Sequence, residues 1–279
     1  MTRRRTVSAP VTFTGLGLHS GRPVTVRVHP ADTGIAFRCG DSRVAAAPAA
    51  VTDTRWHTTL GAVGTVEHLM SAFAGLEITD AEVELSYPEL PALDGSAAGY
   101  VAALRTQPLG EADVVPPLPR GEVVAGTADS SISVRAGTGV WSYTFRHGTG
   151  ARTFTCRLPR DYPTEVAPAR TIAVADQVPA MRAQGLGRGL DESSVVLLTR
   201  DGYANTPRFP DEPARHKLLD LAGDLYLTGI PVGLLDVTAS FSGHSANIAA
   251  AVALLGDTEP APIWSTRPRA PRRGWEQMR

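Results

Sequence analysis

Cysteine is scarce in this chain: Cys39 and Cys156 are the only two among 279 residues, and no CxxC spacing joins them. Their separation indicates neither a disulfide framework nor a thiolate metal site, so a reducing compartment, the cytoplasm, is expected. Lysine is scarcer still, because Lys217 is the only one and the other 26 of the 27 basic residues are arginine. A lone lysine in an arginine-rich chain draws attention to its position.

Neither sign of charge dominates, since 27 basic residues face 28 acidic ones. This balance excludes a strongly basic nucleic-acid-binding protein, and the 43% of apolar residues excludes a disordered chain. A long apolar run is also absent from the sequence, because the longest uncharged stretch, 237–256, contains Ser, His and Asn. We therefore expect no nucleic-acid partner and no stable membrane insertion.

A proline-rich segment near the middle divides the chain. Residues 108–120 hold four prolines among acidic residues and glycine, a composition typical of a linker. Short strand patterns and one or two helical patterns occur on both sides of it. We therefore predict an α+β fold of two domains, 1–107 and 121–264, joined by this linker. Residues 265–279 contain five arginines and are expected to form a flexible basic tail.

Three predicted helices each carry a histidine at a notable place. They run from about Thr65, a candidate N-cap, to Gly75, from near Asp211 to Gly229, and from Ser245 to Leu255. Alternation of apolar and polar residues predicts short strands at 24–28, 34–37, 83–85 and 132–134.

On the second predicted helix, His216, Asp220 and Asp224 fall within about 80° of one another, at about 100° per residue. His216 and Asp220 can offer an imidazole nitrogen and a carboxylate oxygen to one metal ion, and Gly223 permits a close approach. The alternative is a solvated polar face, since such i,i+4 pairs are common on surface helices.

Glu67 and His68, in the first turn of the first predicted helix, are the best candidates to complete such a site. Zinc hydrolases use three protein ligands plus water, and a further carboxylate accepts the proton of the water. An adjacent Glu and His supply one ligand and one base. The alternative is that Glu67 merely suits the positive end of the helix.

His244 lies between an apolar strand pattern and a helix start, in Ser242-Gly243-His244-Ser245. A helix N-terminus disfavours an imidazolium, so a role as an acid needs a nearby carboxylate, which Asp224 can supply. A turn histidine bonded to the backbone fits equally well. The segment 15–21 is glycine-rich but lacks GxGxxG spacing, so it predicts a turn between strands that can form a rim of the cleft.

Together these segments resemble one family, the LpxC family of zinc-dependent UDP-3-O-acyl-N-acetylglucosamine deacetylases of lipid A biosynthesis. The similar stretches occur in the family's order and span nearly the whole chain. They are TGLGLHSGRPVTVRVHPA from Thr14, TVEHLMSAFAGLEI from Thr65, ELPALDGSAAGYV from Glu89, ARTIAV from Ala169, RFPDEPARHKLLDLAGDLYLTG from Arg208 and SGHSANIA from Ser242.

The resemblance implies two α+β domains, each a small sheet layered against helices, with the active site in the cleft between them. It also implies a ligand set for Zn²⁺, and Fe²⁺ suits the same donors. The implied metal ligands are His68, His216 and Asp220. The implied catalytic residues are Glu67 as general base, His244 as electrostatic partner or general acid, Asp224 as its orienting carboxylate, Thr171 as hydroxyl donor to the oxyanion, and Lys217 as contact for the charged part of the substrate.

The implied partner is a small-molecule sugar nucleotide that carries an acyl chain, and a monomer is expected. The family's inserts look shortened here, and residues 174–198, the counterpart of its apolar acyl passage, are rich in Gly and Arg. Acyl-chain length, and acylation itself, therefore stay open. One alternative is an LpxC-like deacetylase of a different N-acetyl amino sugar, in a host without ordinary lipid A. A non-catalytic sugar-nucleotide-binding protein is the other, although the complete catalytic set argues against it.

Overall fold

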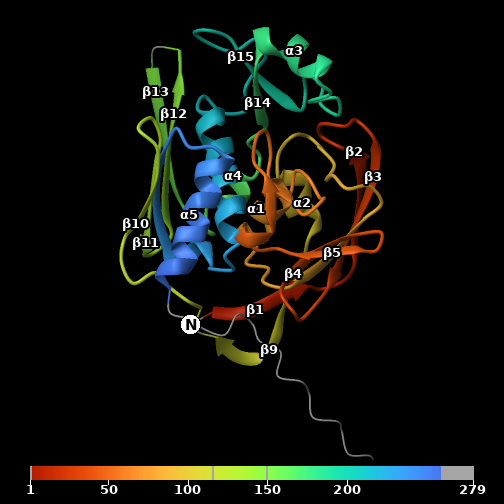
Figure 1. Ribbon diagram of the computed structural model, residues 1–279, viewed down its shortest axis with the longest axis vertical. Helices are drawn as coiled ribbons and strands as arrows, with labels where there is room; N and C mark the ends of the chain where they lie inside the picture. The colour runs from red at the N-terminus through yellow and green to blue at the C-terminus, as the bar shows by residue number, and fades with distance from the viewer. Residues whose placement is uncertain (1, 115, 149, 259–279) are drawn as a thin grey trace, which may run out of the picture.

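Two five-stranded sheets lie on either side of a central layer of helices (Figure 1). The structure is a computed structural model, and it describes residues 2–114, 116–148 and 150–258. The α+β fold, with small sheets layered against helices, is confirmed. The basic tail expected at 265–279 lies outside the described residues.

The N-terminal sheet has the strand order β2-β3-β8-β4-β5. Val24, Val26 and Val28 of β3 are buried, as its period-2 pattern predicts. Every residue of helix α1 is buried, which fits a short helix that is apolar on most sides and lies in the central layer. The elements are β2 (Val11–Leu16), β3 (Pro23–Pro30), β4 (Ile35–Cys39), β5 (Ser42–Ala45), β8 (Ala81–Leu85), α1 (Glu67–Gly75) and α2 (Ala98–Ala103).

The C-terminal sheet, β10-β11-β16-β12-β13, repeats this topology. In both sheets the last strand along the chain is central, antiparallel to one neighbour and parallel to the other. The sequence shows no visible repeat, so the duplication is one of topology. The elements are β10 (Val123–Gly126), β11 (Ser131–Ala136), β12 (Val140–His147), β13 (Gly150–Arg157), β16 (Leu235–Ser240), α4 (Glu212–Tyr226) and α5 (His244–Asp257).

Smaller elements complete the fold. Strand β14 (Thr171–Val174) pairs in parallel with β15 (Val195–Leu198), and α3 (Val178–Ala183) lies between them in the chain, at the top of Figure 1. The others are β1 (Thr2–Val7), β6 (Val51–Asp53), β7 (Thr59–Leu60), β9 (Thr106–Val114), a π-helical turn (Tyr162–Val166) and 3₁₀ turns at Pro48–Ala50, Ala175–Gln177 and Val232–Leu234. None of the described helices is both long enough and apolar enough to cross a membrane.

Two local predictions are corrected by the structure. Of the predicted linker 108–120, residues 108–114 belong instead to β9, which continues to Val114 and pairs with β1. Pro108 is tolerated there because this two-stranded pair is irregular: its register shifts between Arg3 and Arg5, and Arg5 is the partner of Pro108. Thr65 does not cap α1: the N-cap position is Val66, and Thr65, with a φ of 62°, lies in the irregular segment before the helix.

Candidate active site

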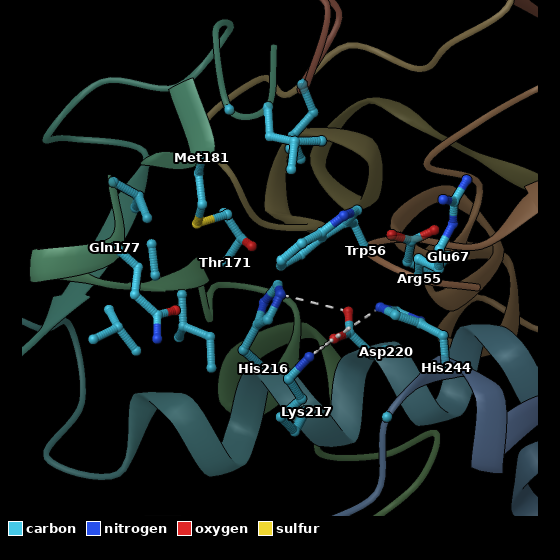
Figure 2. A pocket seen from close by; sticks show the side chains of 18 of the residues that line it. Arg55, Trp56, Glu67, Thr171, Gln177, Met181, His216, Lys217, Asp220 and His244 are labelled. Carbon is cyan, nitrogen blue, oxygen red and sulfur yellow. Dashed lines mark hydrogen bonds and ion pairs between the residues drawn. The ribbon is translucent and has the colours of Figure 1, made fainter. Parts of the chain in front are cut away.

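A cavity of about 910 Å³ brings residues from both halves of the chain together. One part is lined by the polar side chains of α1, α4 and α5, and Figure 2 shows Glu67, His216, Asp220 and His244 converging there. The other part extends toward β14, α3 and β15 and is lined mainly by apolar side chains. These include Ile172, Val178, Met181, Leu186, Leu190, Leu197 and Leu198.

Three buried side chains form a cluster able to hold a metal ion. One potential ligand atom from each of His68, His216 and Asp220 lies within 4.8 Å of the other two. Asp220 Oδ1 is 3.7 Å from His68 Nε2 and 3.4 Å from His216 Nε2. His216 and Asp220, four residues apart on α4, therefore belong to one buried site. They do not form the solvated polar face that was the alternative.

The donor set fits a divalent cation. Asp220 Oδ1 is buried and has no hydrogen-bond partner among the described residues. Buried polar atoms normally have a partner, and a carboxylate oxygen that binds a cation has the cation in that place. His216 Nδ1 lies 3.0 Å from Ala169 O, so with Nδ1–H donating to that carbonyl, Nε2 offers its lone pair to the cluster. Two imidazoles and one carboxylate suit Zn²⁺ or Fe²⁺.

The protonation states favour ligation. Burial, reinforced by His216, lowers the pKa of His68 to about 3, and burial also lowers the pKa of His216. Burial alone would raise the pKa of Asp220, but Lys217 and the imidazoles outweigh it and hold that pKa below its usual range. Neutral imidazoles and an ionised carboxylate are the forms that bind metals.

Glu67 lies beside the cluster as a fourth polar group. It is buried, and this burial, with Asp220 and Asp224 adding to it, raises the pKa of its carboxyl to about 8. The Thr58 amide donates to Glu67 Oε2 at 3.0 Å, which fixes the direction of the carboxyl.

His244 forms a pair with Asp224, as predicted from their sequence positions. His244 Nδ1 lies 2.9 Å from Asp224 Oδ2, and Nε2 is 3.9 Å from Asp220 Oδ2. Burial alone would lower the pKa of His244, but the Asp224 carboxylate outweighs it and raises that pKa to about 9. The imidazole is therefore charged at neutral pH.

Lys217 and Thr171 also line the cavity. Lys217 Nζ donates to Asp220 Oδ2 at 2.9 Å, so the lone lysine contacts the cluster directly. Thr171 begins β14, and its amide donates to Gly95 O at 2.7 Å, which anchors the strand beside the site.

A glycine brings the two site helices together. A Cβ on Gly223 of α4 would lie 2.1 Å from Glu67 O of α1, so only glycine allows this approach. The expectation that Gly223 permits close contact is confirmed, and its consequence is that Glu67 and His68 meet His216 and Asp220. The turn at 15–21 also reaches the cavity through Leu18 and His19.

Sequence reasoning missed Thr58 and Asn247 at the site; Asn247 donates to Asp224 Oδ2 at 2.9 Å, and Thr58 has the larger set of contacts. Thr58 is fully buried and contacts Glu67, Asp224 and His244. No local pattern marks it, because two of its three partners lie more than 160 residues away in the chain.

The fold and site define a class of protein: an α+β metal-dependent hydrolase with a His₂Asp cluster, a neighbouring carboxyl group and a charged histidine in one cavity. Comparison with known proteins gives the family. Residues 4–256 match the model of LpxC, UDP-3-O-acyl N-acetylglycosamine deacetylase, and the chain belongs to this family.

Relatives in several bacteria cover most of the chain. It is 36% identical over 267 residues to the UDP-3-O-acyl-N-acetylglucosamine deacetylase of Chromobacterium violaceum, covering 88% of this chain and 86% of that protein. It is 39% identical over 272 residues to the protein of the same name from an Anaeromyxobacter species, covering 91% and 89%. It is 35% identical over 267 residues to the UDP-3-O-acyl-N-acetylglucosamine deacetylase of Myxococcus xanthus, covering 88% of this chain and 83% of that protein.

Proposed function

We propose that this protein hydrolyses the N-acetyl group of UDP-3-O-acyl-N-acetylglucosamine to acetate and a free amine, in lipid A biosynthesis. The observation that carries the proposal is the buried cluster of His68, His216 and Asp220 beside Glu67 and His244 in one cavity. The names of the relatives support the choice of substrate. A purely sugar-binding protein would have no need of a base beside a metal cluster.

His68, His216 and Asp220 are the proposed ligands of a divalent metal, with Zn²⁺ as the proposed ion. When bound, such an ion polarises the acetamide carbonyl and lowers the pKa of water. Lys217 shares the Asp220 carboxylate and is proposed to meet the charged part of the substrate as well.

Glu67 is the proposed general base. A carboxyl group with a pKa near the working pH can accept the proton of the attacking water and release it again. The Thr58 amide holds one carboxyl oxygen, so the other is free to face the substrate. Thr171, at the edge of the cavity, is the proposed hydroxyl donor to the oxygen on which negative charge develops.

His244 is the proposed general acid. Its charge is maintained by Asp224, and the Nδ1 contact leaves Nε2 directed toward the cluster. Nε2–H can therefore donate a proton to the departing amine as the C–N bond breaks. The products are acetate and the free amine of the sugar.

The apolar part of the cavity is the proposed place of the acyl chain. Its lining comes from β14, α3, β15 and the segment between α3 and β15, which includes Leu186 and Leu190, so it falls largely within the predicted counterpart of the acyl passage, 174–198. A monomer in the cytoplasm completes the proposal, with a first domain that runs through the end of β9 at Val114 and a second domain at 121–264. Light scattering of the purified protein tests the monomer.

The test is acetate release from UDP-3-O-acyl-N-acetylglucosamine and from UDP-N-acetylglucosamine, side by side. We expect a strong preference for the acylated compound. Equal turnover of both would overturn the lipid A assignment and favour a different amino sugar. In a Glu67→Ala variant we expect a rate at least about 100-fold lower with the metal retained, and an unchanged rate would remove Glu67 as the base.

A further inference from the structure

Thr58 connects three groups of the proposed mechanism without touching the cavity. It precedes β7, is fully buried, and does not belong to the lining of the cavity. Its amide donates to Glu67 Oε2 at 3.0 Å. Its hydroxyl donates to Asp224 Oδ1 at 2.5 Å and lies 3.2 Å from His244 Nδ1.

The hydrogen bonds that Asp224 accepts define the role of the Thr58 hydroxyl. Asp224 Oδ2 accepts from Asn247 Nδ2 and from His244 Nδ1, each at 2.9 Å. Asp224 Oδ1 accepts from Thr58 alone among the hydrogen bonds of the described residues. A hydroxyl has one proton and two acceptor lone pairs, so with its proton on Asp224 it presents a lone pair to His244 Nδ1–H. The single Nδ1–H of His244 is thus shared between the Asp224 carboxylate and the Thr58 hydroxyl.

We propose that Thr58 is a positioning residue that fixes the Asp224–His244 pair and Glu67 relative to each other. The inference rests on the proposed function. Its hydroxyl keeps the carboxylate plane of Asp224 from rotating, and the carboxylate in turn aims His244. Its amide aims Glu67 from the same residue. A displacement of about 1 Å in such a group can lower a rate about 100-fold, so the hydroxyl acts on catalysis through its neighbours.

The experiment compares Thr58→Val with Thr58→Ser. Valine replaces the hydroxyl by a methyl group of similar size and keeps the hydrogen bond from the backbone amide to Glu67. Serine keeps this hydrogen bond and the hydroxyl as well. For Thr58→Val we expect kcat to fall about 10–100-fold with unchanged KM and unchanged metal content. Thr58→Ser should restore kcat to near that of the wild type. A merely structural role would lower the folded fraction or the metal content and leave kcat per folded, metal-loaded chain unchanged.

Thr6→Val is the matched control. Thr6 of β1 is equally buried, and its hydroxyl accepts from the Ala31 amide at 3.0 Å, outside the lining of the cavity. Its kcat should equal that of the wild type. A Thr58→Val kcat within about twofold of the wild type, or a Thr58→Ser kcat as low as that of Thr58→Val, would overturn the inference.

Two further measurements keep the test decisive. In a His244→Ala background, Thr58→Val should change kcat little because its target is gone, and an equal loss in both backgrounds contradicts the inference. If the wild type releases no acetate, or Thr58→Val does not fold, the readout is the Nδ1–H proton resonance of His244 in the metal-free protein. That resonance is assigned by its loss in His244→Gln. It should shift in the hydroxyl-free variant that folds, Thr58→Val or Thr58→Ala, and not in Thr58→Ser.

Discussion

Replacing Asp224 by asparagine tests how the charge on His244 is maintained. The substitution preserves shape but removes the negative charge 2.9 Å from His244 Nδ1. In the wild type this carboxylate outweighs burial and raises the pKa of His244 to about 9. Without it, burial is opposed only by the smaller effects of Asp220 and Glu67, so the pKa should fall to the ordinary value of about 6.5 or below.

The expected effect follows from the protonated fraction of His244. At pH 8 this fraction falls from about 0.9 for a pKa near 9 to about 0.03 or less for a pKa of about 6.5 or below, so kcat should fall at least about 30-fold. Because the acid works below its pKa and fails above it, the alkaline limb of the pH profile should move to lower pH in Asp224→Asn. A cation on the neighbouring cluster lowers the pKa in both proteins alike, so the comparison between them carries the test.

The assay is acetate release between pH 5.5 and 9.5, on the order of one measurement every half unit around each expected pKa. Asp41→Asn, in the exposed turn between β4 and β5, is the matched control and should leave the profile unchanged. An alkaline limb at the same pH in Asp224→Asn and the wild type would refute the reasoning.

Three further predictions concern packing and substrate. Gly223→Ala should lower the free energy of unfolding by about 1–3 kcal/mol in urea titrations, because its Cβ would lie 2.1 Å from Glu67 O, and no change would contradict the helix contact. Arg170→Met should lower the free energy of unfolding by about 3–5 kcal/mol, because it leaves the buried Glu212 carboxylate, whose Oε1 lies 3.0 Å from Arg170 Nε, without its charged partner. The double variant Arg170→Met/Glu212→Leu should recover most of this loss. Met181→Glu should raise KM for the acylated substrate at least about tenfold and leave that for UDP-N-acetylglucosamine unchanged, whereas equal effects on both would place the acyl chain elsewhere.

The site on α4 could be predicted only in part from its spacing. Helical periodicity places His216 and Asp220 on one face, but it does not say whether that face meets solvent or another helix. The approach of α1 decides this, and it depends on Gly223 meeting a residue more than 150 positions earlier in the chain. The resemblance to a known family resolved the choice that periodicity left open.

Long-range contacts also explain what was missed. The strand that begins at Thr106 could not be predicted because proline favours a linker, whereas pairing with β1 at the start of the chain stabilises it. Thr58 carries no local signal, since its partners Asp224 and His244 come from the last quarter of the sequence. The shared topology of the two sheets is likewise set by pairing between strands and leaves no visible repeat in the residues.

Titration of metal-free protein with Zn²⁺, with acetate release from UDP-3-O-acyl-N-acetylglucosamine recorded at each addition, tests the central claim most directly. If His68, His216 and Asp220 hold one catalytic ion, activity should rise from zero and level off at one equivalent per chain. Full activity before any Zn²⁺ is added, or a rise with no break at one equivalent, would contradict it.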